Sequence, residues 1–181
     1  MGSTKALLTL GNETFLARVV RSLSEGGCDP VFVVVSEADG AVAEVARNAG
    51  ARVIENPSPG DGPITSLRIA LEAIDDTVDG IAYLPLDHPL VKADTVAALL
   101  QAARSSGSQL VLPIHGLKRG HPAIFRRSLF EELLDPGLEG GARIVVHRHL
   151  VHQFDFPGEV FAHRLFPVLA ALAGGEPNIV S

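Results

Sequence analysis

A carboxylate at the end of an apolar segment is the residue of this chain best placed to do chemistry. Residues 80–86 (Gly-Ile-Ala-Tyr-Leu-Pro-Leu) run directly into Asp87, His88 and Pro89. A short apolar run between turn residues predicts a buried strand of a parallel sheet, and ligands bind outside the carboxyl ends of such strands. Asp87 could therefore hold Mg²⁺, which prefers oxygen ligands, or it could only cap the following loop.

Three further segments combine glycine with side chains that can bind phosphate, sugar or base. They are residues 1–8 (MGSTKALL), residues 56–67 (NPSPGDGPITSL) and residues 119–122 (RGHP). Glycine lets a backbone approach a phosphate closely, and lysine or asparagine can contact a nucleotide. All three segments fall at predicted loops or strand ends.

Composition excludes several classes of function. The chain has 181 residues, 46% hydrophobic and 20% charged, with no tryptophan and a net charge of −6. These values predict a globular domain with its own core, and they argue against binding nucleic acid or an anionic membrane surface. Cys28 is the only cysteine, so the chain has no internal disulfide and no cysteine-based zinc motif. A single cysteine fits a reducing compartment, so we expect a cytoplasmic protein. No segment has the features of a signal peptide or a membrane span.

Helix-like and strand-like segments alternate along the chain, which predicts a sheet covered by helices on both faces. After an N-terminal loop over residues 1–5, helices are expected at 12–25, 39–48, 65–74, 93–104, 126–134, 140–149 and 160–173. Strands are expected at 31–35, 52–54, 80–86, 109–114 and 151–156. No linker or repeat interrupts this order. We therefore predict one α/β domain over residues 1–181, with a mainly parallel sheet.

In their order and spacing the four segments resemble the MobA-like nucleotidyltransferase family, and most closely its molybdopterin cytidylyltransferase branch. That branch has a glycine-rich signature ending in Met-Gly-x-x-Lys-x-Leu-Leu, then Asn-Pro, a glycine before a Ser-Leu helix start, Asp-x-Pro and Gly-His-Pro. The resemblance covers residues 1 to about 154. It implies a Rossmann-like three-layer α/β/α fold of the nucleotide-diphospho-sugar transferase type. A sugar-phosphate nucleotidyltransferase shares the opening signature and remains an alternative.

The resemblance also implies a reaction. A Mg²⁺-dependent enzyme of this kind moves a nucleotidyl group from an NTP to a phosphorylated acceptor such as molybdopterin, and pyrophosphate leaves. Lys5 and Asp87 would be the catalytic residues: Lys5 as a charge on the triphosphate, Asp87 as the ligand of Mg²⁺. Gly2 would let the backbone approach a phosphate. Otherwise, Lys5 is a surface lysine and Gly2 part of a flexible terminus. The branch suggests CTP as the nucleotide, with GTP next.

The remaining implied contacts have ordinary structural alternatives. Asn56, Gly62 and Ser66 would join Gly2 and Lys5 around the nucleotide, but Asn56 could instead close an Asx turn. Ser66 fits the first turn of a helix better than a ligand contact. Gly120 and His121 would lie on the acceptor side, although a loop histidine is more often simply polar surface.

Two departures from the family pattern weaken the expectation of activity. The opening strand and most of its glycine-rich loop are absent, so two strand edges in the middle of the sheet would lack a partner. A start assigned too far along the chain, or a truncation, explains this best; a natural chain without the strand would need a rearranged sheet. The usual Asp-Ile-Asp-Thr-Pro segment is also missing, and only Asp155 and Glu159 supply carboxylates there.

Two other hypotheses remain open. One is a catalytically impaired nucleotide-binding or interaction module on the same fold, in which an apolar helix over residues 161–172 could pack against a second copy to form a homo-oligomer. The other is a transition-metal site of His147, His149 and His152. Residues 147 and 149 share a face only on a strand, and a helix is expected there.

Overall fold

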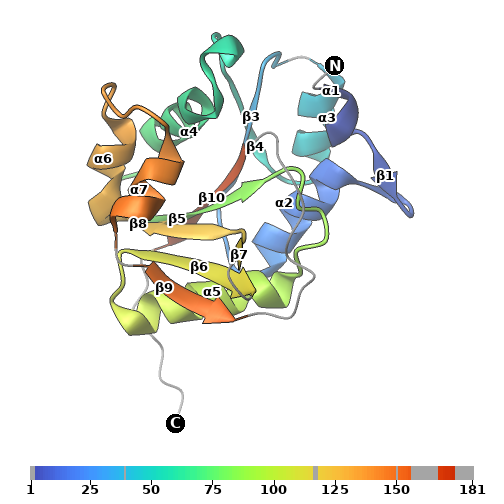
Figure 1. Cartoon of the computed structure of the whole chain (residues 1–181). Helices are drawn as coiled ribbons and strands as arrows, with labels where there is room; N and C mark the ends of the chain where they lie inside the picture. Colours follow the sequence, from blue (N-terminus) through green and yellow to red (C-terminus); the bar gives the residue numbers. More distant parts are fainter. Residues whose placement is uncertain (1–2, 39, 116–117, 150, 156–166, 174–181) are drawn as a thin grey trace.

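The computed structural model describes residues 3–38, 40–115, 118–149, 151–155 and 167–173 (Figure 1). The helices are α1 (Ser3–Ala6), α2 (Phe15–Glu25), α3 (Ala41–Asn48), η1 (Pro59–Asp61), α4 (Pro63–Glu72), α5 (Ala93–Ser106), η2 (Arg127–Leu129), α6 (Phe130–Leu134) and α7 (Ala142–Arg148). The strands are β1 (Thr9–Leu10), β2 (Glu13–Thr14), β3 (Val31–Val35), β4 (Arg52–Glu55), β5 (Val78–Pro85), β6 (Leu110–His115), β7 (Lys118–Arg119), β8 (Ala123–Arg126), β9 (Val151–Asp155) and β10 (Pro167–Ala173).

One eight-stranded sheet organises the described part of the chain. Its strands follow the order β4-β3-β10-β5-β8-β6-β7, and β9 pairs with β6. The pairing directions give β4, β3, β5, β6 and β9 one direction, and β10, β8 and β7 the opposite one. The sheet is therefore mixed. For example, β10 separates β3 from β5, and β8 separates β5 from β6.

Two layers of helices bury the two faces of this sheet (Figure 1). Strand β3 shows why: Val31, Val33 and Val35 join the core under α2, α3 and α5, whereas Phe32 and Val34 join the core under α4, α6 and α7. Side chains of a strand alternate between faces, so an unbroken apolar run fits only a strand covered on both sides. This arrangement confirms the three-layer α/β/α fold.

The C-terminal segment corrects the sequence prediction. Residues 160–173 were predicted to form a helix, yet Pro167–Ala173 form β10, which pairs antiparallel with both β3 and β5. A short apolar run cannot be distinguished from a buried helix by periodicity alone. Here the backbone groups of β3 and β5 decide the outcome, because buried strand edges need hydrogen-bonding partners.

Strand β10 thus fills the mid-sheet position that the sequence left without a strand. The apolar helix proposed for contact with a second copy is wrong over residues 167–172, which are paired inside the sheet. Residues 156–166, which include Glu159, lie outside the described residues.

Smaller differences concern the ends of elements. Residues 3–6 form a helical turn rather than a loop, and the helix expected from residue 12 begins at Phe15, after Thr14 caps it by accepting a hydrogen bond from the Ala17 N–H. The short strands β7 and β8 were missed because Gly120, His121 and Pro122 interrupt them. Within the described residues, no helix is long and apolar enough to cross a membrane.

Cys28 provides a simple test of the core beneath α2. Its side chain is buried, and burial raises the pKa of the thiol to about 12. Because the thiolate is the reactive form, we expect Ellman's reagent to label the folded protein slowly and the denatured protein at once. Cys28 is the only cysteine, so the absorbance change reads this residue alone. Rapid labelling of the native protein would show that this part of the core is open.

Candidate active site

Asp87 lies just beyond the end of β5, as the sequence predicted. Strand β5 ends at Pro85, and the backbone turns there: the N–H of His88 donates to the Pro85 carbonyl, and the N–H of Val91 donates to the His88 carbonyl, each at 3.2 Å. The Asp87 side chain is only 10% exposed. A strand end followed by two tight turns therefore holds this carboxylate in a partly enclosed position.

Three other side chains lie near this carboxylate or pack against one another beside it, and we call the four residues the Asp87 cluster: Tyr83, Asp87, His88 and His121. The Nε2 atom of His88 lies 3.8 Å from Oδ1 of Asp87. The imidazole of His88 packs at a tilt against that of His121, with ring centroids 4.9 Å apart, and His121 meets the edge of Tyr83 at 5.8 Å. The pairing of β5 with β8 brings His121 to Tyr83 and His88, because Tyr83 of β5 is in register with Ala123 of β8.

Burial sets the protonation states of two members of the cluster. It lowers the pKa of His121 to about 4, helped by the nearby His88, so His121 is neutral at neutral pH. Burial and the negative charge of Asp87 raise the pKa of Tyr83 to about 12, so its hydroxyl stays protonated. The Nδ1 atom of His121 lies 3.4 Å from the Tyr83 carbonyl, which can only accept a hydrogen bond. That contact favours the tautomer that leaves Nε2 with its lone pair.

Gly120 positions His121 through its backbone. It is buried, and its N–H donates to the Pro113 carbonyl of β6 at 2.8 Å. The hydrogen bond ties the start of the Gly-His-Pro segment to the sheet, so that His121 points toward β5. His121 is therefore a packed residue of the cluster, and not the exposed loop histidine that was the alternative.

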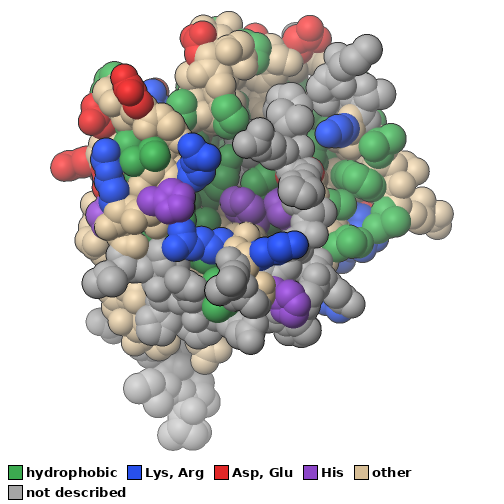
Figure 2. Space-filling view, in the orientation of Figure 1, with side chains coloured by type: hydrophobic (Ala, Val, Ile, Leu, Met, Phe, Trp, Pro, Cys, Tyr) green, Lys and Arg blue, Asp and Glu red, His purple; other side chains and the backbone are tan. Residues whose placement is uncertain are grey.

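One face of the molecule is hollowed and carries positive charge. Figure 2 shows histidine side chains near the centre of a hollow, with lysine and arginine side chains around it. Lys118 and Arg119 of β7 are exposed, and Arg119 contacts the ring of His147 on α7 at 3.4 Å. Cations around a hollow raise the local concentration of an anionic ligand even though the net charge is −6.

Asn56 organises the loop before α4 by hydrogen bonds within the protein. Its side chain is 1% exposed, and its Oδ1 accepts from the Ser58 N–H at 2.9 Å. Its amide group donates to the hydroxyls of Thr65 and Ser66 at 3.1 and 3.0 Å. These bonds form the Asx turn that was the structural alternative, and they use both amide hydrogens of Asn56.

Gly62 and Ser66 belong to the start of α4. Gly62 precedes the helix with φ of 93°, a left-handed conformation that glycine adopts without strain. Ser66 lies in the first turns of the helix, where its hydroxyl accepts from Asn56. Lys5 is exposed on α1, and Gly2 lies outside the described residues. The described contacts thus bring Tyr83, Asp87, His88 and His121 together, and place Asn56, Gly62 and Ser66 in a separate unit.

The three-histidine metal site is not formed by the described side chains. His149 pairs with Glu132, and this partner lowers the pKa of the Glu132 carboxyl. His147 contacts Arg119 instead, and the side chain of His152 is outside the described part. Among the described residues, no group of three His, Cys, Asp or Glu side chains is arranged to hold a metal ion.

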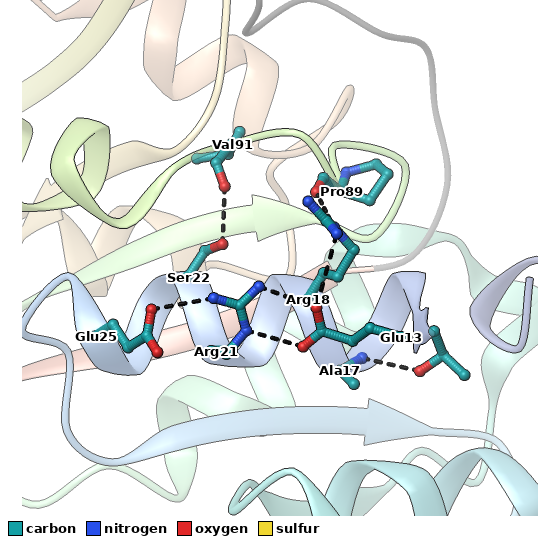
Figure 3. Close-up of polar contacts among 9 residues, drawn as sticks. Glu13, Ala17, Arg18, Arg21, Ser22, Glu25, Pro89 and Val91 are labelled. Carbon is teal, nitrogen blue, oxygen red and sulfur yellow. Dashed lines mark hydrogen bonds and ion pairs between the residues drawn. The ribbon is translucent and has the colours of Figure 1, made fainter. Parts of the chain in front are cut away.

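Helix α2 fastens the loop that follows Asp87 (Figure 3). Arg18 donates from Nε to the Pro89 carbonyl at 3.2 Å, and the buried hydroxyl of Ser22 donates to the Val91 carbonyl at 2.8 Å. Glu13 accepts two hydrogen bonds of 2.9 Å from Arg21, which hold that arginine alongside. A pocket of about 470 Å³ opens between α2 and residues 90–93. It lies on the α2 side of the loop and is lined by none of the Asp87 cluster.

Removal of the Ser22 hydroxyl tests this fastening. Ser22→Ala leaves the Val91 carbonyl without that partner, and we expect a loss of about 1–2 kcal/mol of unfolding free energy. Ser105→Ala is the control, because its exposed hydroxyl only bonds back to its own helix. Urea unfolding followed by circular dichroism measures both variants. Equal stabilities of the two variants would mean that the Ser22 bond contributes nothing.

The residues at this strand end fit a divalent cation. A buried carboxylate supplies the oxygen ligand that Mg²⁺ needs, and Mg²⁺ in NTP sites uses one or two carboxylates, the phosphates and water. Asp87 is such a carboxylate, and His88 adds a nitrogen 3.8 Å from it. Asp155 ends β9 in register with Ile114 of β6, but nothing described places its side chain at the site.

Sequence reasoning missed the roles of His88 and Tyr83. His88 was considered only as the residue before a proline, and Tyr83 only as part of a strand. The sequence did show that His88 follows Asp87 at a strand end, where a histidine and a carboxylate can bind the same ligand. The contact of both residues with His121 depends on pairing between segments that are distant in the sequence.

Comparison with known proteins shows which proteins this chain is similar to. The model of the MobA-like NTP transferase domain matches residues 1–154 of the chain. A probable molybdenum cofactor guanylyltransferase of Mycobacterium avium is 30% identical over 146 residues, covering 79% of this chain and 71% of that protein. A phosphoenolpyruvate guanylyltransferase of a Mycobacterium species is 35% identical over 124 residues, covering 67% of this chain and 54% of that protein.

Solved structures agree with the fold. The Rv0371C protein of Mycobacterium tuberculosis, solved in complex with manganese, superposes with a TM-score of 0.70 at 25% identity, over 87% of this chain and 84% of that one. Molybdopterin-guanine dinucleotide biosynthesis protein A of Archaeoglobus fulgidus gives a TM-score of 0.60 at 20% identity, over 83% and 74%. The molybdenum cofactor relatives found are guanylyltransferases, so the expected cytidylyltransferase branch is not supported.

Proposed function

The chain belongs to the MobA-like NTP transferase family, and we propose that it transfers the guanylyl group of GTP to a phosphorylated small-molecule acceptor at the Asp87 cluster. As a member of this family it is a nucleotidyltransferase that uses an NTP and an acceptor. GTP rather than CTP is proposed because relatives with different acceptors, molybdenum cofactor and phosphoenolpyruvate, share the guanylyl group in their names.

The position of Asp87 carries the proposal. A mostly buried carboxylate just beyond the end of β5, with the exposed cations Lys118 and Arg119 directly before Gly120 and His121, suits a reaction in which negative charge develops on phosphates. An oxygen of the acceptor phosphate attacks the α-phosphorus of GTP, and a new P–O bond forms. The bond from the α-phosphorus to the bridging oxygen breaks, and pyrophosphate leaves with the electron pair.

Each predicted site residue has a role in this proposal. Asp87 would hold the divalent cation, which when bound neutralises charge on the triphosphate. Lys5 would contribute a positive charge to the triphosphate, and Gly2 would allow its close approach. The loop of Asn56, with Gly62 and Ser66 at the start of α4, would border the nucleotide, with Asn56 shaping the loop. Gly120 and His121 would face the acceptor, His121 as a neutral donor or acceptor of hydrogen bonds.

Nucleotide-dependent stabilisation tests the choice of base. A ligand that binds only the folded state raises the melting temperature, so we would compare GTP, CTP, ATP and UTP with and without a divalent cation. We expect a metal-dependent rise that is largest for GTP. A larger rise with CTP would restore the cytidylyl assignment. Binding of GTP without turnover of either molybdopterin or phosphoenolpyruvate would favour the non-catalytic module.

A further inference from the structure

Asp87 and His88 are arranged so that one metal ion can bind both. We propose that His88 is a second protein ligand of the divalent cation and that the site therefore prefers Mn²⁺ to Mg²⁺, an inference that rests on the proposed NTP site. The Nε2 atom of His88 and Oδ1 of Asp87 are 3.8 Å apart. Two cis ligands at about 2.1 Å from an octahedral ion lie about 3.0 Å apart, so a closing of this distance by roughly 0.8 Å lets both atoms bind one ion.

The imidazole of His88 is held in this orientation by its neighbours. Its side chain is 8% exposed, and its ring packs against His121 at a centroid distance of 4.9 Å. His121 is itself held by the carbonyl of Tyr83 and by the edge of the Tyr83 ring. The ring of His88 therefore has little freedom to turn away from Asp87, and a ligand fixed in place loses little entropy when it binds.

The ligand set decides which ion is preferred. Magnesium favours oxygen ligands, whereas imidazole suits first-row transition ions, and Mn²⁺ accepts both oxygen and nitrogen. Asp87 and His88 supply two ligands, and the phosphates of the nucleotide and water can supply the rest. The Rv0371C protein, at 25% identity, was solved in complex with manganese, and this observation concerns that protein.

Electron spin-echo spectroscopy of the complex with Mn²⁺ and GTP tests the proposal directly. A coordinated imidazole imposes a ¹⁴N modulation on the Mn²⁺ signal, and labelling of histidine with ¹⁵N changes that modulation. We expect the modulation in the wild-type protein and its change on ¹⁵N-histidine labelling, which requires no variant to fold. Free Mn²⁺-GTP is the reference for nitrogen from guanine.

Two variants then show which histidine supplies the nitrogen that binds Mn²⁺. His88→Gln should abolish the modulation and weaken Mn²⁺ binding about tenfold or more, with a smaller effect on Mg²⁺. His147→Gln, an exposed histidine on α7, should preserve both. A Mn²⁺-GTP complex of the wild-type protein without protein nitrogen would overturn the role of His88 and leave the proposed function standing. Failure to form any complex of protein, Mn²⁺ and GTP would overturn both.

Discussion

Asp87→Asn is expected to lower kcat/KM for guanylyl transfer by about 100- to 1,000-fold, which is the largest effect of any single change proposed here. Asparagine keeps the shape of the side chain but removes the negative charge that would hold the cation. Because this charge acts on phosphates throughout the reaction, its loss should reduce transition-state stabilisation by about 3–4 kcal/mol. Release of pyrophosphate from GTP, with whichever of molybdopterin and phosphoenolpyruvate supports turnover, measures the effect.

The same strand offers a matched control for this substitution. Asp79 is exposed near the start of β5, at the far end of the strand from Asp87. Asp79→Asn removes the same charge from the same strand, and we expect it to change kcat/KM by less than about twofold, as is usual for an exposed surface position. Equal activity losses in the two variants would indicate that net charge, and not the site, determines the rate. Full activity of Asp87→Asn would remove Asp87 from the mechanism.

Asn56→Ala is expected to destabilise the protein by about 2–3 kcal/mol. Three hydrogen bonds are lost together: one from the Ser58 N–H, and one each to the hydroxyls of Thr65 and Ser66. The side chain is 1% exposed, so water cannot readily replace it. We also expect weaker GTP binding, because the loop and the start of α4 lose their connection. Chemical denaturation and GTP titration of the same sample measure both quantities.

Ser58→Ala is the control for Asn56, because Ser58 takes part in this network only through its backbone N–H. This variant should retain stability within about 0.5 kcal/mol. The comparison also separates the two roles that the sequence left open for Asn56. A variant Asn56→Ala with unchanged stability but a large loss of GTP affinity would show a direct contact with the nucleotide, and would contradict the role in shaping the loop.

Local patterns in the sequence predicted an element correctly where an apolar run and the turn residues that flank it indicate the same bounds. Val31–Val35 form the strand that their unbroken apolar run predicted, and α5 begins at the predicted Ala93. The position of Asp87 beyond a buried strand was also predictable, because the apolar run before it and Pro89 after it define that end. These features depend on residues close together in the chain, where periodicity and turn propensity carry the information.

Features that depend on distant pairing were not predictable in the same way. Pro167–Ala173 are apolar enough for either a buried helix or a buried strand, and only the edges of β3 and β5 select the strand. The contact of His88 with His121 arises from the pairing of β5 with β8, and β8 itself was not predicted. The protonation states of His121 and Tyr83 follow from burial, which no local motif specifies.

The position of a bound metal in the presence of nucleotide shows whether Asp87 holds the cation of the reaction. We would crystallise the protein with GTP and Mn²⁺ and locate the manganese by its anomalous scattering. We expect a manganese peak at the carboxylate of Asp87, in contact with the phosphates of GTP. GTP and manganese bound elsewhere, such as in the pocket between α2 and residues 90–93, would contradict it.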